Sequence, residues 1–344
     1  MTDRALHVAW TTFQRRQVSM SALLDMDVEF LPVGNGGRVQ KAVSYAACYA
    51  RTLAMLIHRR PAAVWVQVPQ TPALWAALAY RALIRRDAAV IADCHNAAFR
   101  RPWSRFPGSR QALQSSDLIV VHNQSVVEQA LALDLPHDRI AVLEDPPATF
   151  NAPSLNDDRL DPSRKPVFLF PASLAADEPI RELVETARML PQYRFQTTGR
   201  REKLGRHVDP ASLPANFETL GYLSVEEFER ALRSADVIMG FTRLEGVQLS
   251  VCSEAVGYGK PMLLSDTRIL RELFGTAAVF ADSSQPSSIA AACHAALEQK
   301  DGLSEASRAL FVVRRRMWLE DQALPLLRRR LAGRGAVALV RQDG

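Results

Sequence analysis

The sequence predicts an α/β protein of two domains, each built on a parallel sheet that helices cover on both faces. Short apolar runs alternate with helical patterns along most of the chain, and this alternation is typical of parallel sheets. It is interrupted by a stretch rich in Pro, Asp, Asn and Ser that ends at Pro166. The chain has 344 residues, which is too long for one comfortable core and fits two domains.

The first domain is expected to span residues 1–150. Its predicted strands are the apolar runs Leu6–Ala9, Val28–Leu31, Val64–Val68, Ala89–Ala92, Leu118–Val121 and Ile140–Leu143. Its predicted helices are Lys41–His58, Thr71–Ile84 and Ser125–Leu133. Pro72 suits the first turn of the second of these helices, where its missing N–H has no partner to lose.

Residues 151–165 are expected to form a linker, because their composition favours turns and loops. The second domain is expected to span residues 166–303. Its predicted strands are Val167–Phe170, Arg194–Thr198, Phe217–Leu220, Val237–Phe241, Met262–Ser265 and Ala278–Ala281. Its predicted helices are Pro179–Leu190, Val225–Ser234, Leu249–Tyr258 and Pro286–Gln299. Residues 304–344 are expected to form a C-terminal helix and tail, with an amphipathic pattern from Ser304 to Arg330.

Composition narrows the class of protein. The four cysteines are far apart and form no CxxC pair, which argues against zinc and disulfides and favours a reducing cytosol. The N-terminus has no signal-peptide pattern, and the most apolar window, Pro72 to Ile84, is short and contains Arg81. We therefore expect a cytoplasmic protein.

The formal net charge is +5, and part of the excess lies in two arginine runs, 314–316 and 328–330. These runs indicate either a solvated helix face or a peripheral contact with anionic lipid headgroups or a phosphorylated acceptor. Nucleic acid is not expected as a partner, because no aromatic residues are interleaved with the arginines.

Several common nucleotide sites are excluded by their missing motifs. Neither domain has a G-x-G-x-x-G after its first strand, and the chain has no GxxxxGK[ST]. Asp25-Met26-Asp27 forms an Asp-x-Asp pair, but it precedes a strand and is expected to be a solvated turn. No cofactor and no metal are therefore expected.

The stretch from Phe241 to Asp266 is the most informative part of the chain. It is predicted to run from a strand end through a loop and a helix into the next strand, with Glu245 before the helix and Glu254 in its first turn. Amides at a helix start hold phosphate, and carboxylates accept hydrogen bonds from ribose or sugar hydroxyls. These are the parts of a nucleotide-sugar site.

This stretch resembles the C-terminal motif of retaining glycosyltransferases of the GT-B fold, in the large family-4-like group. The family pattern is roughly E-G-F-G-L-P-x-x-E-A-x-x-x-G-K-P followed by a strand and Ser-Asp. Here Glu245-Gly246, Glu254-Ala255, Gly259-Lys260-Pro261 and Ser265-Asp266 match it, with one residue more between the two glutamates. The resemblance implies two Rossmann-like domains that face a cleft, and a C-terminal helix that crosses back to the first domain.

The resemblance also assigns roles to individual residues. Glu254 would accept the ribose hydroxyls, Glu245 would act at the donor sugar, and Gly246 with the amides of Val247, Gln248 and Leu249 would approach the donor phosphates. The family's basic clamp on the diphosphate is absent, since Ser173 and Glu178 stand at its positions. Its nearest substitutes are Arg200, Arg201 and Arg243, while Gly221 and Tyr222 resemble the segment beside the base.

Three residues of the first domain are candidates on the acceptor side. His95 follows a strand, as does the segment that often presents an active-site histidine in the family, and it would be catalytic together with Glu245. Arg15 and Arg16, just after the first strand, could meet acceptor or phosphate charge or simply lie at a surface helix.

The resemblance implies transfer of a hexosyl group from a nucleoside-diphosphate sugar to a hydroxyl acceptor with retention, by metal-independent departure and attack on one face. The acceptor would be a lipid-linked glycan of polysaccharide biosynthesis or a small molecule. Two alternatives stay open: a nucleotide-sugar epimerase of the same fold, and a non-catalytic binding subunit. A phosphorylase is disfavoured, because lysines for a pyridoxal cofactor are scarce.

Overall fold

The computed structural model describes residues 5–34, 36–148 and 164–330, and its contacts divide the chain into two compact units. Unit 1 comprises residues 1–146 and 315–344, and unit 2 comprises residues 147–314. Apart from Arg164 and Lys165, the predicted linker 151–165 lies outside the described residues.

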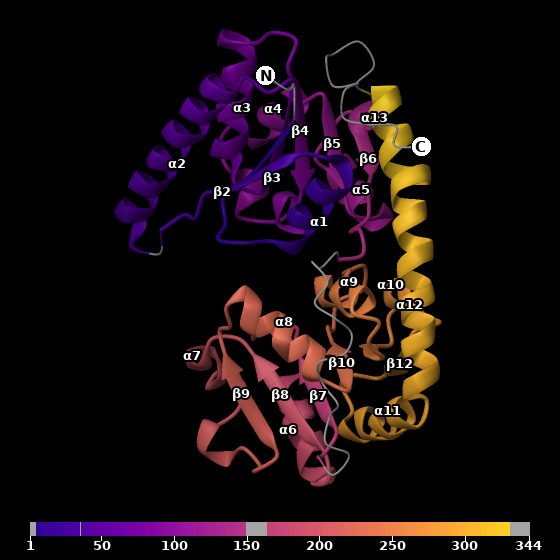
Figure 1. Cartoon of the computed structure of the whole chain (residues 1–344). Helices are drawn as coiled ribbons and strands as arrows, with labels where there is room; N and C mark the ends of the chain where they lie inside the picture. Colours follow the sequence, from indigo (N-terminus) through magenta and orange to yellow (C-terminus); the bar gives the residue numbers. More distant parts are fainter. Residues whose placement is uncertain (1–4, 35, 149–163, 331–344) are drawn as a thin grey trace. The chain divides into compact units, whose positions relative to one another are not determined.

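Unit 1 contains a six-stranded parallel sheet with the order β2-β1-β3-β4-β5-β6 (Figure 1). Its strands are β1 (Leu6–Ala9), β2 (Asp27–Phe30), β3 (Ala63–Val68), β4 (Ala89–Cys94), β5 (Leu118–Val121) and β6 (Ile140–Val142). Its helices are α1 (Arg15–Leu24), α2 (Arg38–Arg59), α3 (Thr71–Leu83), α4 (Ser109–Ser115), α5 (Gln124–Leu131) and α13 (Leu324–Arg330). One face of the sheet packs against α2, α3, α4 and α5, and the other against α1 and the C-terminal segment.

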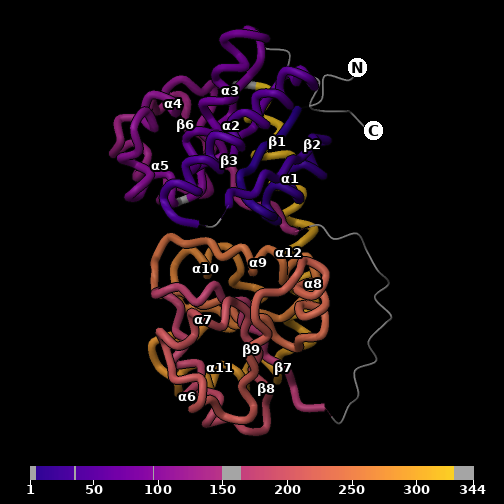
Figure 2. Tube along the Cα trace, turned by 90° about the vertical axis from the view of Figure 1, so that its left-hand side faces the viewer, coloured from indigo at the N-terminus to yellow at the C-terminus, as the bar shows by residue number. Residues whose placement is uncertain are grey.

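Unit 2 repeats this plan with the strand order β12-β11-β10-β7-β8-β9, again all parallel. Its strands are β7 (Val167–Phe170), β8 (Arg194–Thr198), β9 (Phe217–Gly221), β10 (Val237–Gly240), β11 (Met262–Ser265) and β12 (Ala278–Ala281). Its helices are α6 (Ile180–Met189), α7 (Arg201–Leu204), α8 (Val225–Ser234), α9 (Ser250–Gly257), α10 (Arg268–Phe274), α11 (Pro286–Glu298) and α12 (Lys300–Met317). The helices α6 and α11 lie side by side on one face (Figure 2), and α8, α9, α10 and α12 cover the other.

Each sheet has a point where the strand order reverses, between β1 and β3 in unit 1 and between β7 and β10 in unit 2. The loops that leave the carboxyl ends of two such strands run to opposite faces of the sheet, and ligands of open α/β sheets bind in the crevice between them. The fold therefore places the candidate site of unit 2 among the loops that follow β7 and β10.

The predicted C-terminal helix from Ser304 to Arg330 is helical but not uniform. The helix α12 begins at Lys300, and a wider π-helical turn at Trp318–Ala323 separates it from α13. Pro325 explains the irregular turn, because its ring clashes with the carbonyl four residues earlier and it donates no hydrogen bond. From Arg315 onward the chain belongs to unit 1.

Trp318 anchors this C-terminal segment to the sheet of unit 1. Its side chain is 2% exposed and packs among Met20, Leu24 and Trp65, while its indole Nε1 donates to Glu144 O at 2.8 Å. We predict that Trp318→Ala lowers the free energy of unfolding by about 3–5 kcal/mol, as for other large core truncations. Chemical denaturation followed by tryptophan fluorescence and circular dichroism measures this loss.

The matched control is Trp75→Ala, since the side chain of Trp75 is 36% exposed and should cost less to remove. Equal losses for the two variants would contradict the assignment of Trp318 as the anchor.

Candidate functional site

The loops at the carboxyl ends of β7, β8 and β10 are tied together by side chains. Thr198 Oγ1 accepts from Ala172 N at 3.0 Å and donates to Ala172 O at 3.1 Å, which joins the ends of β8 and β7. Thr242 Oγ1, just after β10, donates to Asp177 Oδ2 at 2.6 Å. Arg243 N donates to Asp177 O at 2.9 Å. Hydrogen bonds therefore join the loops that follow β7, β8 and β10 at the point where the strand order reverses.

Two glycines on this edge are required by the backbone. Gly246 has a φ of 70°, in the left-handed region that favours glycine. Gly199 has a φ of 102°, and a Cβ on it would lie 2.9 Å from Ala172 O and from Leu174 Cγ. Glycine thus lets the loop after β8 pack directly on the loop after β7.

Glu178 makes an unexpected contact with the loop after β7. One carboxylate oxygen accepts from both the N and the Oγ of Ser173 at 3.0 Å, and the other accepts from Ala175 N at 3.0 Å. Leu174, between these two residues, has a left-handed φ of 57°. Successive amides turned this way form a concave anion site, and here the chain's own carboxylate fills it.

The basic residues of this edge belong to the short segment after β8. Arg200 is exposed and precedes α7, and Arg201 Nη2 donates to Thr219 O at 3.0 Å. Lys203 Nζ donates to Ser173 O at 3.1 Å, so a lysine that the sequence reasoning missed reaches the loop after β7. Its position three residues after Arg200, on the same helical turn, is the signal that could have identified it.

Arg243, the third predicted substitute for the clamp, is turned toward α6. Its Nη2 donates to Glu182 Oε1 at 2.6 Å, and Glu182 neutralises its charge.

The two glutamates of the motif lie in different environments. Glu245 is exposed, and its Oε2 accepts from Arg268 N, the first residue of α10, at 3.3 Å. Glu254 is only 6% exposed and is the fifth residue of α9, so it lies beyond the first helical turn where we had expected it. The preference for acidic residues in the first turn of a helix therefore does not explain a glutamate at this position.

Residues 247–249 precede α9, which begins at Ser250. Both amide atoms of Gln248 and the Oγ of Ser253 are shielded from solvent and have no hydrogen-bond partner within the described ranges. Buried polar atoms without a partner are uncommon in native proteins.

The last candidates of unit 2 lie at the carboxyl end of β9. Gly221 is the last residue of β9 and has a φ of 79°, and Tyr222 is 73% exposed.

Unit 1 has a buried polar cluster at the carboxyl ends of β1, β4, β5 and β6, hereafter the Arg16 cluster. Its members are His7, Arg16, Gln17, Asp93, His122 and Asp145. Arg16 pairs with Asp93 Oδ1 at 3.1 Å and with Asp145 Oδ1 at 2.5 Å. It also donates to Leu143 O and Glu144 O at 3.0 and 2.8 Å. Its Nε donates to the Asp93 carboxylate at 3.3 Å. These five contacts match the five N–H donors of a guanidinium, so the side chain of Arg16 is fully engaged inside unit 1.

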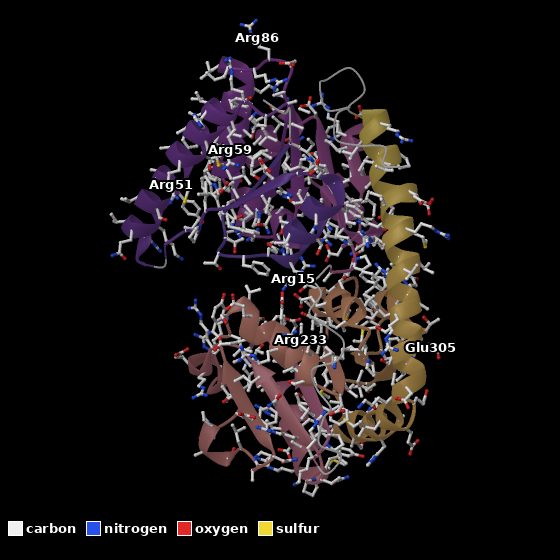
Figure 3. The ribbon with its side chains drawn as sticks, viewed as in Figure 1. Arg15, Arg51, Arg59, Arg86, Arg233 and Glu305 are labelled. Carbon is white, nitrogen blue, oxygen red and sulfur yellow. The ribbon has the colours of Figure 1, made fainter. Side chains whose placement is uncertain are left out.

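Arg15, the neighbouring candidate, begins α1 at the edge of unit 1 (Figure 3). Its guanidinium lies 4.9 Å from the centre of the Phe13 ring, a cation–π contact.

His95 follows β4 directly at the same edge. Its ring stands edge-on to the ring of His122, with 5.8 Å between the centroids, and its Nδ1 accepts from Ala97 N at 3.5 Å. His122 Nδ1 lies 3.6 Å from Asp145 Oδ1, so His122 connects His95 with the Arg16 cluster. His122 was missed by the sequence reasoning, although it follows a strand in the same way as His95.

The histidines of this region are held in the neutral form. Burial lowers the pKa of His7 and of His122 to about 4, and Arg16 contributes in both cases. Desolvation also lowers the pKa of His95, although part of that residue is exposed. Asp93 has a pKa lowered to about 2, because Arg16 and the nearby histidines outweigh the effect of its burial.

The remaining features of the described residues do not add to the candidate site. An open groove of about 860 Å³ lies in unit 2 near the amino ends of β7 and β8 and along β9, away from Glu245 and Glu254. No group of three or more His, Cys, Asp or Glu within the described part of the chain could hold a metal ion. Asp25 ends α1 with a left-handed φ of 50° and Asp27 starts β2, which confirms the predicted turn. None of the described helices combines the length and the apolarity needed to cross a bilayer.

Comparison with known proteins identifies the fold. No family model and no curated protein matches the sequence. Sucrose-phosphate synthase from Thermosynechococcus elongatus is similar in structure, with a TM-score of 0.66, 12% identity, and coverage of 90% of this chain and 94% of that one. HepE from Anabaena in complex with UDP-glucose has a TM-score of 0.65, 13% identity and coverage of 92% and 97%. A glycosyltransferase from Rickettsia africae has a TM-score of 0.63, 12% identity and coverage of 96% and 99%.

At these identities the similarity establishes the fold alone. The chain has the predicted GT-B fold, with two Rossmann-like domains that each contain a parallel six-stranded sheet.

The Arg16 cluster predicts a characteristic loss of stability in acid. The unfolded chain protonates its histidines near pH 6.5, whereas folded His7 and His122 resist protonation down to about pH 4. Their neutral state therefore stabilises the fold above pH 6.5, and this contribution is lost as the pH falls toward 4. Each shift corresponds to about 3 kcal/mol. Asp93 adds a further loss between its ordinary value of 3.8 and about 2.

Urea unfolding at a series of pH values between neutral and mildly acidic measures this slope, and His122→Phe should reduce it. The control His58→Gln removes an exposed histidine of α2 and should leave the slope unchanged. A free energy of unfolding that is flat across this range in the wild-type protein would contradict the neutral, buried histidines.

Proposed function

We propose that this protein is a retaining glycosyltransferase that moves a hexosyl group from a nucleoside-diphosphate sugar to a hydroxyl acceptor. One observation carries the proposal: the loop after β10 and the helix α9 that follows it contain Gly246, the unpartnered amide of Gln248 and the buried Glu254, in the span expected to hold a nucleotide sugar. A metal-independent reaction, a cytoplasmic location and a role in polysaccharide biosynthesis on a lipid-linked acceptor complete the proposal; a small-molecule acceptor is the other possibility.

In this proposal unit 2 holds the donor. Glu254 accepts the ribose hydroxyls, the backbone at Gly246 approaches the diphosphate closely, and Gly221 with Tyr222 lies beside the base. Glu245, which is exposed in the loop after β10 and accepts from the first amide of α10, is assigned to the hydroxyls of the donor sugar. Arg200 and Lys203, exposed or directed at the loop after β7, supply the positive charge that the leaving diphosphate needs.

Unit 1 supplies the acceptor side. His95 is assigned to the transferring sugar, to which it would donate a hydrogen bond: with Nδ1 accepting from Ala97 N, a neutral ring carries its proton on Nε2. Arg15 remains the candidate for acceptor or phosphate charge, while Arg16 acts through the Arg16 cluster by fixing the strand ends around His95 and His122. No carboxylate is assigned as a nucleophile. Departure of the nucleotide and attack on the same face then retain the configuration, and the leaving phosphate takes the acceptor proton.

The transfer itself is tested by incubating the protein with UDP-, GDP-, ADP- and TDP-sugars and measuring release of the nucleoside diphosphate with and without a lipid-linked or small-molecule hydroxyl acceptor. Acceptor-dependent release supports transfer. Conversion of the sugar without any acceptor would indicate an epimerase. Failure of every donor to bind in calorimetry would refute the proposed enzyme.

Glu254→Gln provides the sharpest single substitution for donor binding. We predict a 10- to 100-fold loss of affinity for the best donor, because a charge-assisted hydrogen bond contributes about 1.5–3 kcal/mol. Isothermal calorimetry measures the loss in a variant whose melting temperature shows that it is folded. The matched control is Glu272→Gln, an exposed carboxylate on α10 paired with Arg268, which should leave the affinity unchanged.

Glu178 supports a second candidate function, a non-catalytic subunit that binds sugar or nucleoside without transferring it. Its carboxylate fills the amide site of the loop after β7 and places a negative charge where a diphosphate would otherwise bind. Donor binding to the wild-type protein without any turnover would favour this candidate.

We predict that Glu178→Gln raises the affinity for a nucleoside diphosphate by about tenfold, since removing a nearby like charge is worth about 1–2 kcal/mol at a partly exposed site. Glutamine keeps an oxygen for Ser173 but loses the acceptor for Ala175 N, so the melting temperature of the variant is compared with that of the wild type. Calorimetry with UDP measures the gain, and the control is Glu185→Gln, an exposed carboxylate on α6, the helix that follows this loop. A lower affinity in Glu178→Gln would mean that the carboxylate supports the site rather than blocking it.

A further inference from the structure

The open groove of unit 2, hereafter the β9 groove, lies beside β9, the edge strand of its sheet (Figure 1). Its volume of about 860 Å³ falls within the roughly 300–1,000 Å³ of sites that bind small molecules. The end of α6, the start of β8 and the residues before β9 border it. These parts lie at the amino ends of the strands, whereas the candidate donor loops leave the carboxyl ends. The β9 groove is therefore a separate place in which a ligand could bind.

The lining of the β9 groove is predominantly basic. Its charged members among the described residues are Lys165, Arg188, Arg194, Arg201 and Glu218. Arg194 pairs with Glu218, which also accepts from Gln196 Nε2 at 2.9 Å. The hydrogen bonds from Gln196 and Arg194 lower the pKa of Glu218, so its negative charge offsets that of Arg194. A surplus of positive charge remains in the lining.

Lys165 and Arg201 supply this surplus. Lys165 Nζ donates to Pro191 O at 2.9 Å, and Arg201 Nη2 donates to Thr219 O at 3.0 Å. Carbonyl oxygens hold both cations in place without neutralising them, and neither cation forms an ion pair within the described ranges. Such cations remain available for charge-assisted hydrogen bonds to an anion.

Hydrogen bonds also fix the walls of the groove. Asn216 Nδ2, in the loop before β9, donates to three carbonyls at 2.9–3.0 Å, those of Ala187, Leu190 and Tyr193. Arg188 Nη2 donates to Ser212 O at 2.7 Å and ties the same loop to α6 a second time. A groove with walls held in this way is already formed before a ligand binds, so binding does not have to order the loop.

We propose that the β9 groove is a second binding site, for a small molecule that carries a phosphate group and hydroxyls. The lysine and arginine donors of the lining contact the phosphate. Arg194 and Gln196 both donate to Oε2 of Glu218, so Oε1 of this carboxylate can accept from a hydroxyl of the ligand. The inference goes beyond the proposed transferase and does not depend on it.

A peptide strand added to β9 is a poorer occupant of the groove. Phe217 and Thr219 are the residues of β9 whose backbone groups point away from β8. Phe217 N already donates to Pro214 O at 2.9 Å, and Thr219 O accepts from Arg201. An added strand would lose these ladder positions, and a charged side chain over an edge strand opposes pairing with another chain. The edge of β9 therefore favours a small molecule.

Isothermal calorimetry on the full chain tests the site, with glucose 6-phosphate, ribose 5-phosphate and glycerol 3-phosphate as probes. At least one probe should bind, more tightly than glucose or inorganic phosphate does. Hydrogen–deuterium exchange with the tightest probe locates it, and amides of residues 188–194 and 214–219 should exchange more slowly.

The variant Lys165→Gln/Arg188→Gln should bind that probe at least about tenfold more weakly and with less dependence on salt, because two donors to the phosphate lose their charge. Both side chains are exposed, and circular dichroism checks the fold. The matched control is Arg230→Gln, an exposed cation of α8 on the other face of the sheet, which should bind as the wild type does.

Glu218→Gln separates contact with the ligand from a loss of structure. It should bind inorganic phosphate more tightly, because a like charge is removed, and its preference for the probe over inorganic phosphate should fall. A merely distorted groove would lose both ligands together, which would contradict the role of Glu218.

Failure of all three probes to bind would overturn the proposal. Binding of glucose or of inorganic phosphate as tightly as the best probe would also overturn it. So would slower exchange confined to residues 171–178 and 241–250, the loops after β7 and β10, or an equal loss of binding in Arg230→Gln and in the double variant.

Discussion

Two parallel sheets, each covered on both faces, decide where chemistry can occur in this protein. Every residue of β3, β4, β10 and β11 is buried, so these strands offer no polar surface along their length. Polar groups that meet a ligand must therefore stand at strand ends, and the reversal of strand order opens a space only at the carboxyl ends. Gly240, where a Cβ would lie 2.8 Å from Leu264, shows how tightly the strands are packed just below that edge.

The same constraint explains the Arg16 cluster. A guanidinium and two carboxylates are buried together at the end of the sheet in unit 1, with histidines that stay neutral. Burying such groups costs desolvation energy that their attraction roughly offsets, so the cluster is weak evidence for stability. What it does provide is position, because Arg16 joins α1 to the ends of β4 and β6 and thereby sets the surroundings of His95 and His122.

The apolar pattern of the sequence predicts the strands and the longer helices, but it does not predict the contacts of the candidate site. All twelve predicted strands occur in the described residues. Wholly buried strands such as β3, β7 and β10 are nearly continuous apolar runs and are therefore easy to recognise. The short helices α4, α7 and α10 were not predicted, since one or two turns give too few residues for a helical period to be recognised. The roles of Glu178 and Arg16 could not be predicted either. Both depend on partners brought together by the fold, Ser173 with Ala175 in one case and Asp93 with Asp145 in the other.

The central claim is that the carboxyl edge of unit 2 binds a nucleoside-diphosphate sugar. Hydrogen–deuterium exchange with the nucleotide sugar that gives the largest thermal shift tests it most directly, because amides that meet the ligand exchange more slowly. Protection is predicted in the loops that follow β7, β8, β9 and β10, at residues 171–178, 199–204, 221–224 and 241–250. Protection confined to residues 188–194 and 214–219, which contribute to the groove beside β9, would contradict it.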